Sequence, residues 1–277
     1  MLFIEILKSI LFGVVEGITE WLPVSSTGHM ILLNEFLTLD VSPEFYEMFE
    51  VVIQLGAILA VIVLFFGKLN PFAPSKNREQ KKATWSLWFK VIVAVIPSAV
   101  IGVLLDDWFN EKFYNYVTVA VMLIVYGIAF IIIEKFNKKD RVRIESVDQI
   151  GYKDAFLVGA FQVLSIIPGT SRSGSTILGG MLFGLSRASV AEFSFFMAIP
   201  TMLGASLLKA VKFFAKGATV SLNEWIILAV GCAVAFFVSI LVIRFLMDFV
   251  KRHTFSSFGV YRIILGALVL LYFLLTR

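Results

Sequence analysis

Charge and cysteine are both scarce in this sequence. Charged residues make up 16% of the 277 positions, whereas soluble domains contain about 25%; 59% of the positions are hydrophobic, which gives a mean hydropathy of +0.90. A core of this size cannot hide so much apolar surface. The composition therefore excludes a soluble enzyme, a nucleic-acid binder and a disordered chain, and it predicts an integral membrane protein. The single cysteine, Cys232, excludes an intrachain disulfide.

The sequence also lacks the strict apolar–polar alternation of a transmembrane barrel, so we expect an all-α integral membrane protein. Its N-terminus has no basic region and no small-residue cleavage site, which indicates mature chain rather than a signal peptide. The length suits a single membrane domain over 1–277. We attribute the net charge of +4 to basic cytoplasmic loops and expect no nucleic-acid partner.

Long apolar segments dominate what is present. Two apolar stretches, 1–37 and 153–184, are interrupted by proline and a run of small hydroxyl residues. Irregular backbone at membrane depth must be buried in protein or line a wet cavity, so we interpret both as re-entrant helical hairpins. Six other segments have the roughly 20 apolar residues that a transmembrane helix needs: 48–66, 86–105, 113–133, 187–211, 225–247 and 259–276.

The basic residues fall into three clusters. If the chain has six spans and two re-entrant hairpins, all three clusters lie on the same face of the membrane. By the positive-inside rule that face is cytoplasmic, so the loops at roughly 67–85 and 135–152 lie inside and both termini outside. Each half of the chain, roughly 1–135 and 150–277, is then one hairpin followed by three spans. The halves have opposite orientations, and such an inverted-topology repeat predicts a site between its two broken segments near the midplane.

Two carboxylates precede the first interruption. Glu16 and Glu20 are four residues apart and share one face of a helix. Facing carboxylates repel each other and are costly in apolar surroundings, so they favour a divalent cation, Mg²⁺ or Ca²⁺. The alternative is that both lie in water at the outer interface.

The first interruption carries a group of hydroxyls and a histidine: Ser25, Ser26, Thr27 and His29. A serine here can simply cap the following helix. A helix start rarely needs three hydroxyls and a histidine, however, so the cluster also suggests chemistry. Ser26 is the candidate nucleophile, His29 the candidate base or phosphate contact, and Ser25 and Thr27 are candidate substrate ligands.

Arg172 is the most informative residue of the second interruption. An arginine inside an apolar hairpin costs about 2.5–3.5 kcal/mol, so it needs either a function or a structural ion pair with Glu16 or Glu20. Small residues and accessible backbone N–H groups surround it and are typical of a phosphate site, although the sequence has no Walker motif. The predicted anion ligands are Arg172, Gly169, Thr170, Ser171, Ser173, Gly174 and Thr176.

Three further polar residues interrupt apolar runs. Glu50 and Gln54 share one helix face and are secondary candidates for the site, and Glu192 stands in the fourth span. Positions near the membrane interface would explain the glutamates equally well. From the residues alone two classes of function stay open: a phosphohydrolase acting on a lipid-linked phosphate, and a secondary transporter or flippase for an anionic solute or lipid phosphate. The combination of hydroxyl, histidine, arginine and carboxylates favours chemistry.

The motifs also resemble those of a known family. EGITEWLPVSSTGHM at 16–30 and PGTSRSGST at 168–176 are similar to the signature motifs of the undecaprenyl pyrophosphate phosphatase family, the bacitracin-resistance type. FEVVIQLGAILAV at 49–61 and AEFSFFMAIP at 191–200 also resemble it. The resemblance carries over to Glu16, Glu20, Ser26, His29 and Arg172, and in the second motif to Ser171, Ser173 and Thr176.

This resemblance implies a multi-pass enzyme of the bacterial plasma membrane. It would convert the C55 isoprenyl pyrophosphate to the monophosphate, recycle the carrier lipid for peptidoglycan synthesis and confer bacitracin resistance. It implies a divalent cation and an active site open to the outer side, and it leaves open a homodimer. Two mechanisms are consistent with it: attack by Ser26 to give a phospho-enzyme, or attack by an activated water that Ser26 and His29 position.

Overall fold

The computed structural model describes residues 2–136 and 142–276. The regular secondary structure in this part of the chain is helical, apart from one isolated bridge between Ile144 and Leu185. Six helices are long and apolar enough to cross a membrane, which confirms the predicted number of spans. Their bounds are Pro43–Leu64, Arg78–Leu105, Tyr116–Phe136, Arg187–Ala215, Leu222–Arg252 and Ser256–Thr276.

The chain order of the elements is simple. The first half contains α1 (Leu2–Thr19), α2 (Ser26–Phe36), α3 (Pro43–Val52), α4 (Gln54–Leu64), the short α5 (Phe66–Leu69), α6 (Arg78–Phe113) and α7 (Tyr116–Phe136). After the 3₁₀ turn η2 (Val147–Gln149), the second half contains α8 (Tyr152–Gln162), η3 (Val163–Ile166), α9 (Arg172–Leu182), α10 (Arg187–Ala215), α11 (Leu222–Arg252) and α12 (Ser256–Thr276).

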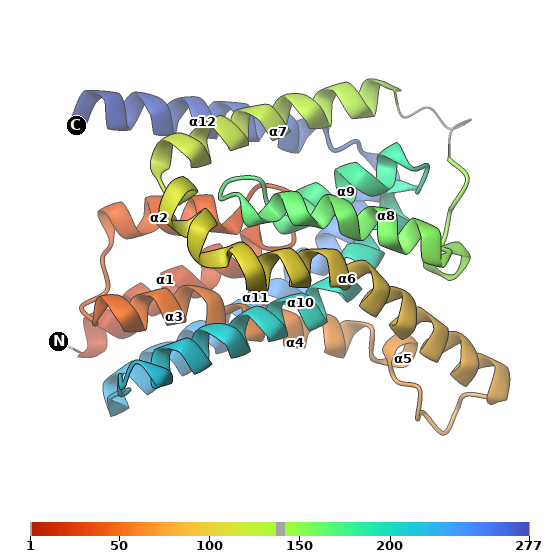
Figure 1. Ribbon diagram of the computed structural model, residues 1–277, viewed down its shortest axis with the longest axis horizontal. Helices are drawn as coiled ribbons and strands as arrows, with labels where there is room; N and C mark the ends of the chain where they lie inside the picture. Colours follow the sequence, from red (N-terminus) through yellow and green to blue (C-terminus); the bar gives the residue numbers. More distant parts are fainter. Residues whose placement is uncertain (1, 137–141, 277) are drawn as a thin grey trace.

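Several helices extend beyond the predicted apolar windows. α6 begins at Arg78, inside the segment expected to be a loop, and continues for 36 residues, or about 54 Å. Hydropathy delimits only the part that suits lipid, about 30 Å, whereas a helix continues while its backbone bonds are satisfied. α1 begins and α12 ends at one end of the molecule, and 70–77 and 142–151 lie at the other end (Figure 1).

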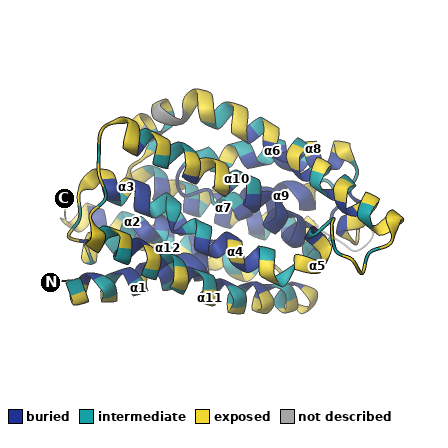
Figure 2. Cartoon of the chain, turned by 90° about the horizontal axis from the view of Figure 1, so that it is seen from below, coloured by how far each residue is buried: buried dark blue, intermediate teal, exposed yellow. Residues whose placement is uncertain are grey.

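The surface of the bundle is apolar in the way a lipid-facing surface requires. Large side chains such as Leu104, Phe237 and Leu241 are exposed on the long helices. Buried residues concentrate inside, particularly along α9 and α10, while exposed residues lie on the outward faces (Figure 2). The bundle therefore hides its small polar groups and presents its hydrocarbon outward, which fits a multi-pass membrane protein.

Close backbone contacts hold the two halves together. On α1, a Cβ at Gly13 would lie 2.7 Å from the carbonyl oxygen of Gly231 on α11, so only glycine permits this approach. α8 meets α6 in the same way, because a Cβ at Gly159 would lie 1.8 Å from the carbonyl oxygen of Ala94. Small residues at helix interfaces are typical of membrane bundles. Each broken helix thus packs on the second long helix of the opposite half.

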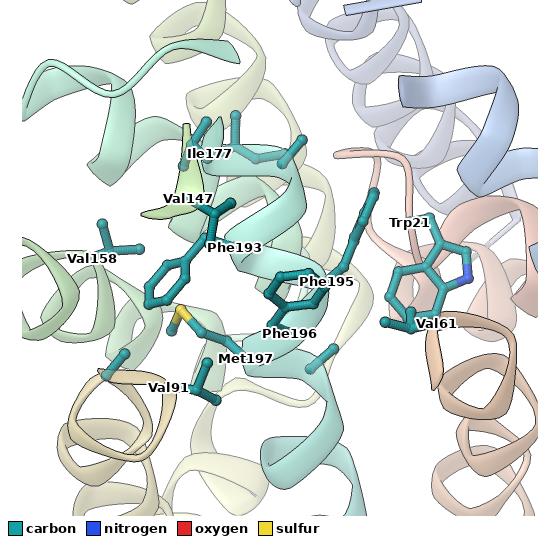
Figure 3. Packing of buried hydrophobic residues seen from close by; sticks show 14 of the residues in the cluster. Trp21, Val61, Val91, Val147, Val158, Ile177, Phe193, Phe195, Phe196 and Met197 are labelled. Atoms are coloured by element: carbon teal, nitrogen blue, oxygen red, sulfur yellow. The ribbon is translucent and has the colours of Figure 1, made fainter. Parts of the chain in front are cut away.

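An aromatic core fixes the turn after α1. The ring of Trp21 packs edge-on against Phe195 of α10 with 5.2 Å between centroids, and both side chains are fully buried. Figure 3 draws Trp21 beside Phe195 and close to Val61 of α4. Burial of an indole of this size anchors the turn that carries Glu20.

Candidate active site

The two interruptions have the same local backbone. Ser25 caps α2 and accepts a hydrogen bond from the Gly28 amide at 3.3 Å, while Ser171 caps α9 and accepts one from the Gly174 amide at 3.1 Å. Both serines have a positive φ, 74° and 73°, which is strained for a residue with a Cβ. Strain of this kind persists only where the surrounding structure enforces it, and it concentrates at functional sites.

Both helix starts open onto one cavity of about 170 Å³. The N-termini of α2 and α9 therefore direct their unsatisfied amides and the positive ends of their dipoles towards the same space, which favours an anion. The residues that line it are Glu20, Ser25, Ser26, Thr27, Gln54, Ser165, Ile167, Pro168, Gly169, Ser171, Arg172, Thr201, Met202 and Ala205.

Glu20, Ser26 and Arg172 meet in this cavity. The Ser26 hydroxyl donates to Glu20 Oε2 at 2.6 Å, and Arg172 Nη2 donates to Glu20 Oε1 at 2.8 Å. Glu20 and Ser26 are 6% and 8% exposed, so water screens these contacts weakly. The carboxylate is placed to accept the proton of the hydroxyl, and the arginine offers it an opposite charge. The ion pair considered from sequence is thus present within the same group as the candidate nucleophile.

Arg172 is held on its other side by α10. Its Nη1 donates to the Ser194 carbonyl at 2.8 Å and to the Ser194 hydroxyl at 3.2 Å, and its guanidinium lies 5.7 Å from the centroid of the Trp21 ring. These contacts leave the arginine well positioned. Its Nη2 is bonded to Glu20, and its Nε has no hydrogen-bond partner among the described residues.

His29 is directed away from Ser26. Its Nδ1 lies 2.7 Å from the Ser25 carbonyl and its Nε2 lies 2.7 Å from the Tyr261 hydroxyl, against which its ring stacks. The structure therefore does not bring His29 to the candidate nucleophile, and the group in contact with the Ser26 hydroxyl is the Glu20 carboxylate.

Glu16 differs sharply from Glu20. It is 1% exposed, and neither of its carboxylate oxygens has a hydrogen-bond partner among the described residues. No group of three or more histidine, cysteine, aspartate or glutamate side chains with metal-binding geometry occurs in the part of the chain that the structure describes. Mg²⁺ commonly takes one or two carboxylates and completes its shell with substrate phosphates and water. The unpartnered Glu16 oxygens fit such an incomplete site.

Several hydroxyls of the second motif are used for structure. Thr170, Ser173 and Thr176 are fully buried and do not line the cavity. Thr170 donates to the Ile167 carbonyl at 2.7 Å, Ser173 to the Glu20 carbonyl at 3.1 Å, and Thr176 Oγ1 lies 2.6 Å from Ser194 Oγ. Gly174 supplies the amide that Ser171 caps. Of the predicted anion ligands, Gly169, Ser171 and Arg172 border the cavity.

Of the secondary candidates, one borders the cavity and the others do not. Gln54, at the start of α4, borders the cavity. Glu50 accepts hydrogen bonds from the Tyr46 hydroxyl at 2.9 Å and the Tyr114 hydroxyl at 3.0 Å. Glu192 pairs with Lys68. Both glutamates have ordinary polar partners outside the group formed by Glu20, Ser26 and Arg172.

Sequence reasoning missed two residues of this region. Ser194 braces Arg172, and nothing in an isolated serine on an apolar helix indicates that role. Arg262 on α12 is fully buried and contacts both interruptions, through the carbonyls of Pro23 and Gly169. A charged residue inside the last apolar segment is the same signal that drew attention to Arg172, and it could have identified Arg262.

Comparison with known proteins agrees with this geometry. The model of the family described as "Bacitracin resistance protein BacA" matches residues 9–268. The undecaprenyl-diphosphatase of Enterococcus faecalis is 58% identical over 274 residues, which are 99% of each chain. That of Limosilactobacillus fermentum is 56% identical over 272 residues, 98% of this chain and 99% of the other. Because these matches cover nearly the whole sequence, the chain belongs to the bacitracin resistance protein BacA family.

Proposed function

We propose that this protein is an undecaprenyl-diphosphatase, a membrane enzyme that hydrolyses undecaprenyl pyrophosphate to the monophosphate. The observation that carries the proposal is the 2.6 Å hydrogen bond from Ser26 to Glu20 beside Arg172, in a cavity bordered by the starts of two helices. The names of the relatives at 56–58% identity support the same reaction. The family description supports bacitracin resistance as part of this proposal. Recycling of the carrier lipid for peptidoglycan synthesis is a further part of it.

The geometry suggests a mechanism in two steps. The Ser26 oxygen attacks the terminal phosphorus while its proton passes to Glu20 Oε2, and the anhydride P–O bond breaks to release the lipid monophosphate. Water then attacks the phosphoserine and releases phosphate. Arg172 and the free amides at the starts of α2 and α9 hold the phosphoryl oxygens. In the alternative, Glu20 activates a water directly and Ser26 only positions the phosphate.

A divalent cation is part of this proposal. Glu16 is the residue that would hold it, and the cation would neutralise charge on the transferred phosphoryl group. The described side chains supply the other functions: Glu20 takes up the proton, and Arg172 binds and orients the phosphate.

We further propose that α1–α2 and α8–α9 are re-entrant hairpins of an inverted repeat. The contacts between the halves support this, because the first broken helix of each half packs on a long helix of the other half: α1 on α11, and α8 on α6. In this topology the two interruptions meet near the midplane of the bacterial plasma membrane, and the cavity opens to the outer side. The pyrophosphate enters through that opening while the isoprenyl tail stays in lipid. A homodimer remains a prediction that molar-mass measurement in detergent would check.

The transporter or flippase alternative is not favoured. To bind its solute, an anion transporter needs positively charged side chains and helix N-termini. It does not need a hydroxyl that donates to a buried carboxylate. The relatives of this chain are also named as diphosphatases. The two classes of function nonetheless make different experimental predictions.

Phosphate release from undecaprenyl pyrophosphate by the purified protein in detergent tests the proposal. The wild type should release one phosphate per lipid, Glu20→Gln should lose nearly all activity, and the exposed carboxylate variant Glu47→Gln should retain it. Absence of phosphate release from a folded wild-type protein would overturn the proposed function. Transfer of the lipid across proteoliposomes without hydrolysis would support the alternative instead.

A further inference from the structure

Arg262 connects the backbones of the two interruptions. It is fully buried on α12, and its guanidinium donates to the Pro23 carbonyl at 3.0 Å, the Gly169 carbonyl at 2.6 Å and the Thr170 carbonyl at 3.1 Å. Longer bonds of 3.4 Å reach the carbonyls of Leu123 and Met122 on α7. One side chain from the last helix therefore holds loops that are almost 150 residues apart in sequence.

The charge of Arg262 has no carboxylate partner among the described residues. Arg172, in contrast, is paired with Glu20, and Arg187 is paired with Glu134. The contacts of Arg262 are with carbonyl oxygens and the ring face of Tyr126, whose centroid is 5.4 Å from its guanidinium carbon. A buried charge without a counter-charge is costly and normally avoided. Its retention beside the cavity suggests that the counter-charge arrives with the substrate.

The position of Arg262 relative to the cavity supports this idea. It does not line the cavity but lies behind its wall, since its Nη2 donates to the carbonyl of Gly169, a residue that borders the cavity. In a trans peptide the C=O and N–H point in opposite directions. By binding the Thr170 carbonyl, Arg262 turns the Ser171 amide to the other side of that peptide, and Ser171 borders the cavity.

We propose that Arg262 is a positioning residue that supplies the uncompensated positive charge of the pyrophosphate site and fixes the two loops that form it. The proposal rests on the proposed phosphatase function, because the ligand is the pyrophosphate group. The charge of Arg172 is already paired with Glu20, whereas the charge of Arg262 has no carboxylate partner among the described residues. Two effects should then be separable: its charge strengthens binding, and its fork of donors orients the loops for the chemical step.

Two substitutions at Arg262 separate these effects. Arg262→Lys keeps the charge but reaches fewer carbonyls, so kcat should fall about tenfold or more while the inhibition constant of inorganic pyrophosphate stays within about threefold of wild type. Arg262→Gln removes the charge, so the inhibition constant should rise about tenfold and kcat should fall as well. Arg187→Gln, which breaks a partly buried ion pair outside the cavity lining, is the structural control and should change Tm alone.

A second pair of variants leaves Arg262 intact. Tyr126→Glu introduces a counter-charge against the guanidinium, and Tyr126→Gln is its neutral control. The glutamate variant should raise the inhibition constant of inorganic pyrophosphate about tenfold relative to the glutamine variant. This pair keeps the proposal testable if the Arg262 variants fail to fold.

The outcomes distinguish this proposal from the proposed function. Stabilisation of the wild type by inorganic pyrophosphate in a thermal-shift assay reports anion binding without turnover, so an inactive but pyrophosphate-binding protein would overturn the phosphatase function alone. Arg262→Lys and Arg262→Gln that lower Tm alike but leave the inhibition constant unchanged would overturn the charge role. Equal inhibition constants for Tyr126→Glu and Tyr126→Gln would overturn it as well.

Discussion

The two interruptions share one backbone conformation but present side chains of different chemistry. Each follows a proline, starts a helix with a positive-φ serine, and bonds that serine to a glycine amide three residues later. When the two sequences are aligned at the caps Ser25 and Ser171, Ser26 corresponds to Arg172. The first interruption thus presents a hydroxyl beside a carboxylate, and the second presents a cation. The shared backbone conformation places both helix starts at one cavity. The residue after each cap differs, so α2 contributes a candidate nucleophile and α9 contributes a positive charge.

Loss of the Ser26 hydroxyl should have the largest effect on kcat. If Ser26 is the nucleophile, Ser26→Ala should lower kcat by about 10⁴-fold or more, since loss of a nucleophile removes the reaction path itself. If Ser26 only donates a hydrogen bond to phosphate, the loss should be about 10–100-fold. Phosphate release under single-turnover conditions measures this. A phosphoserine trapped at Ser26 by acid quench would establish the covalent route, and a variant within about tenfold of wild type would exclude it.

Loss of the cation in the second interruption should follow. Arg172→Ala should lower kcat by about 10²–10³-fold, as removal of a preorganised donor does in other enzymes, with the protein still inserted in the membrane. Arg172→Lys should rescue activity poorly, because an ammonium cannot bind Glu20 and Ser194 with a planar fork. Steady-state kinetics on both variants decides the matter. Nearly full activity of the lysine variant would show that charge alone suffices.

The two carboxylates of the first interruption should respond differently to metal. Glu16→Gln should lower activity about tenfold at low Mg²⁺ and recover at high Mg²⁺, because the variant has lost one ligand of an incomplete site. Glu20→Gln should not recover, since its partners are Arg172 and Ser26. Titration of Mg²⁺ and Ca²⁺ against a chelator measures the difference. Identical metal dependence of wild type and Glu16→Gln would move the cation away from Glu16.

The smallest effect should come from the caps that the interruptions share. Ser25→Ala and Ser171→Ala should each destabilise the protein by about 1 kcal/mol or somewhat more, because each loses a cap and keeps a positive φ. Ser25→Gly and Ser171→Gly should cost less, since glycine accepts that φ freely. Thermal unfolding in detergent compares the four variants. If the alanine variants were as stable as the glycine variants, the strain at these positions would be negligible.

The sequence predicted the fold class and the two interruptions better than it predicted contacts. Hydropathy found all six spans, because burial in lipid is a local property of each segment. Proline and hydroxyl runs found the interruptions, because they act on the backbone nearby. Both interruptions contain Pro-x-x-Ser, at 23–26 and at 168–171, but this shared spacing does not align their caps. The cap Ser25 lies two positions after Pro23, whereas the cap Ser171 lies three positions after Pro168.

The roles of the polar side chains depended on distant segments. The pattern grouped Glu16 with Glu20 and Ser26 with His29, since these residues are close in sequence. In the folded chain Glu20 instead contacts Arg172, 152 positions away, and His29 contacts Tyr261, 232 positions away. The buried charge of Arg172 had pointed to Glu16 or Glu20 as alternative partners, whereas nothing in the sequence pointed to Tyr261. The packing of α1 and α2 against the second half creates both contacts.

By itself, the sequence determined that this protein is a helical membrane bundle with two polar interruptions that carry carboxylates, hydroxyls and an arginine. Composition and periodicity fix these features because each depends on a residue and its immediate neighbours. Only the folded chain shows that Ser26 donates to Glu20, that the Glu16 oxygens lack a partner among the described residues, and that Arg262 contacts both loops. Ser26 meets Glu20 because the chain turns between α1 and α2, whereas Arg262 reaches both loops because α12 packs against α7. The energy of a buried polar group depends on the partner that such packing supplies.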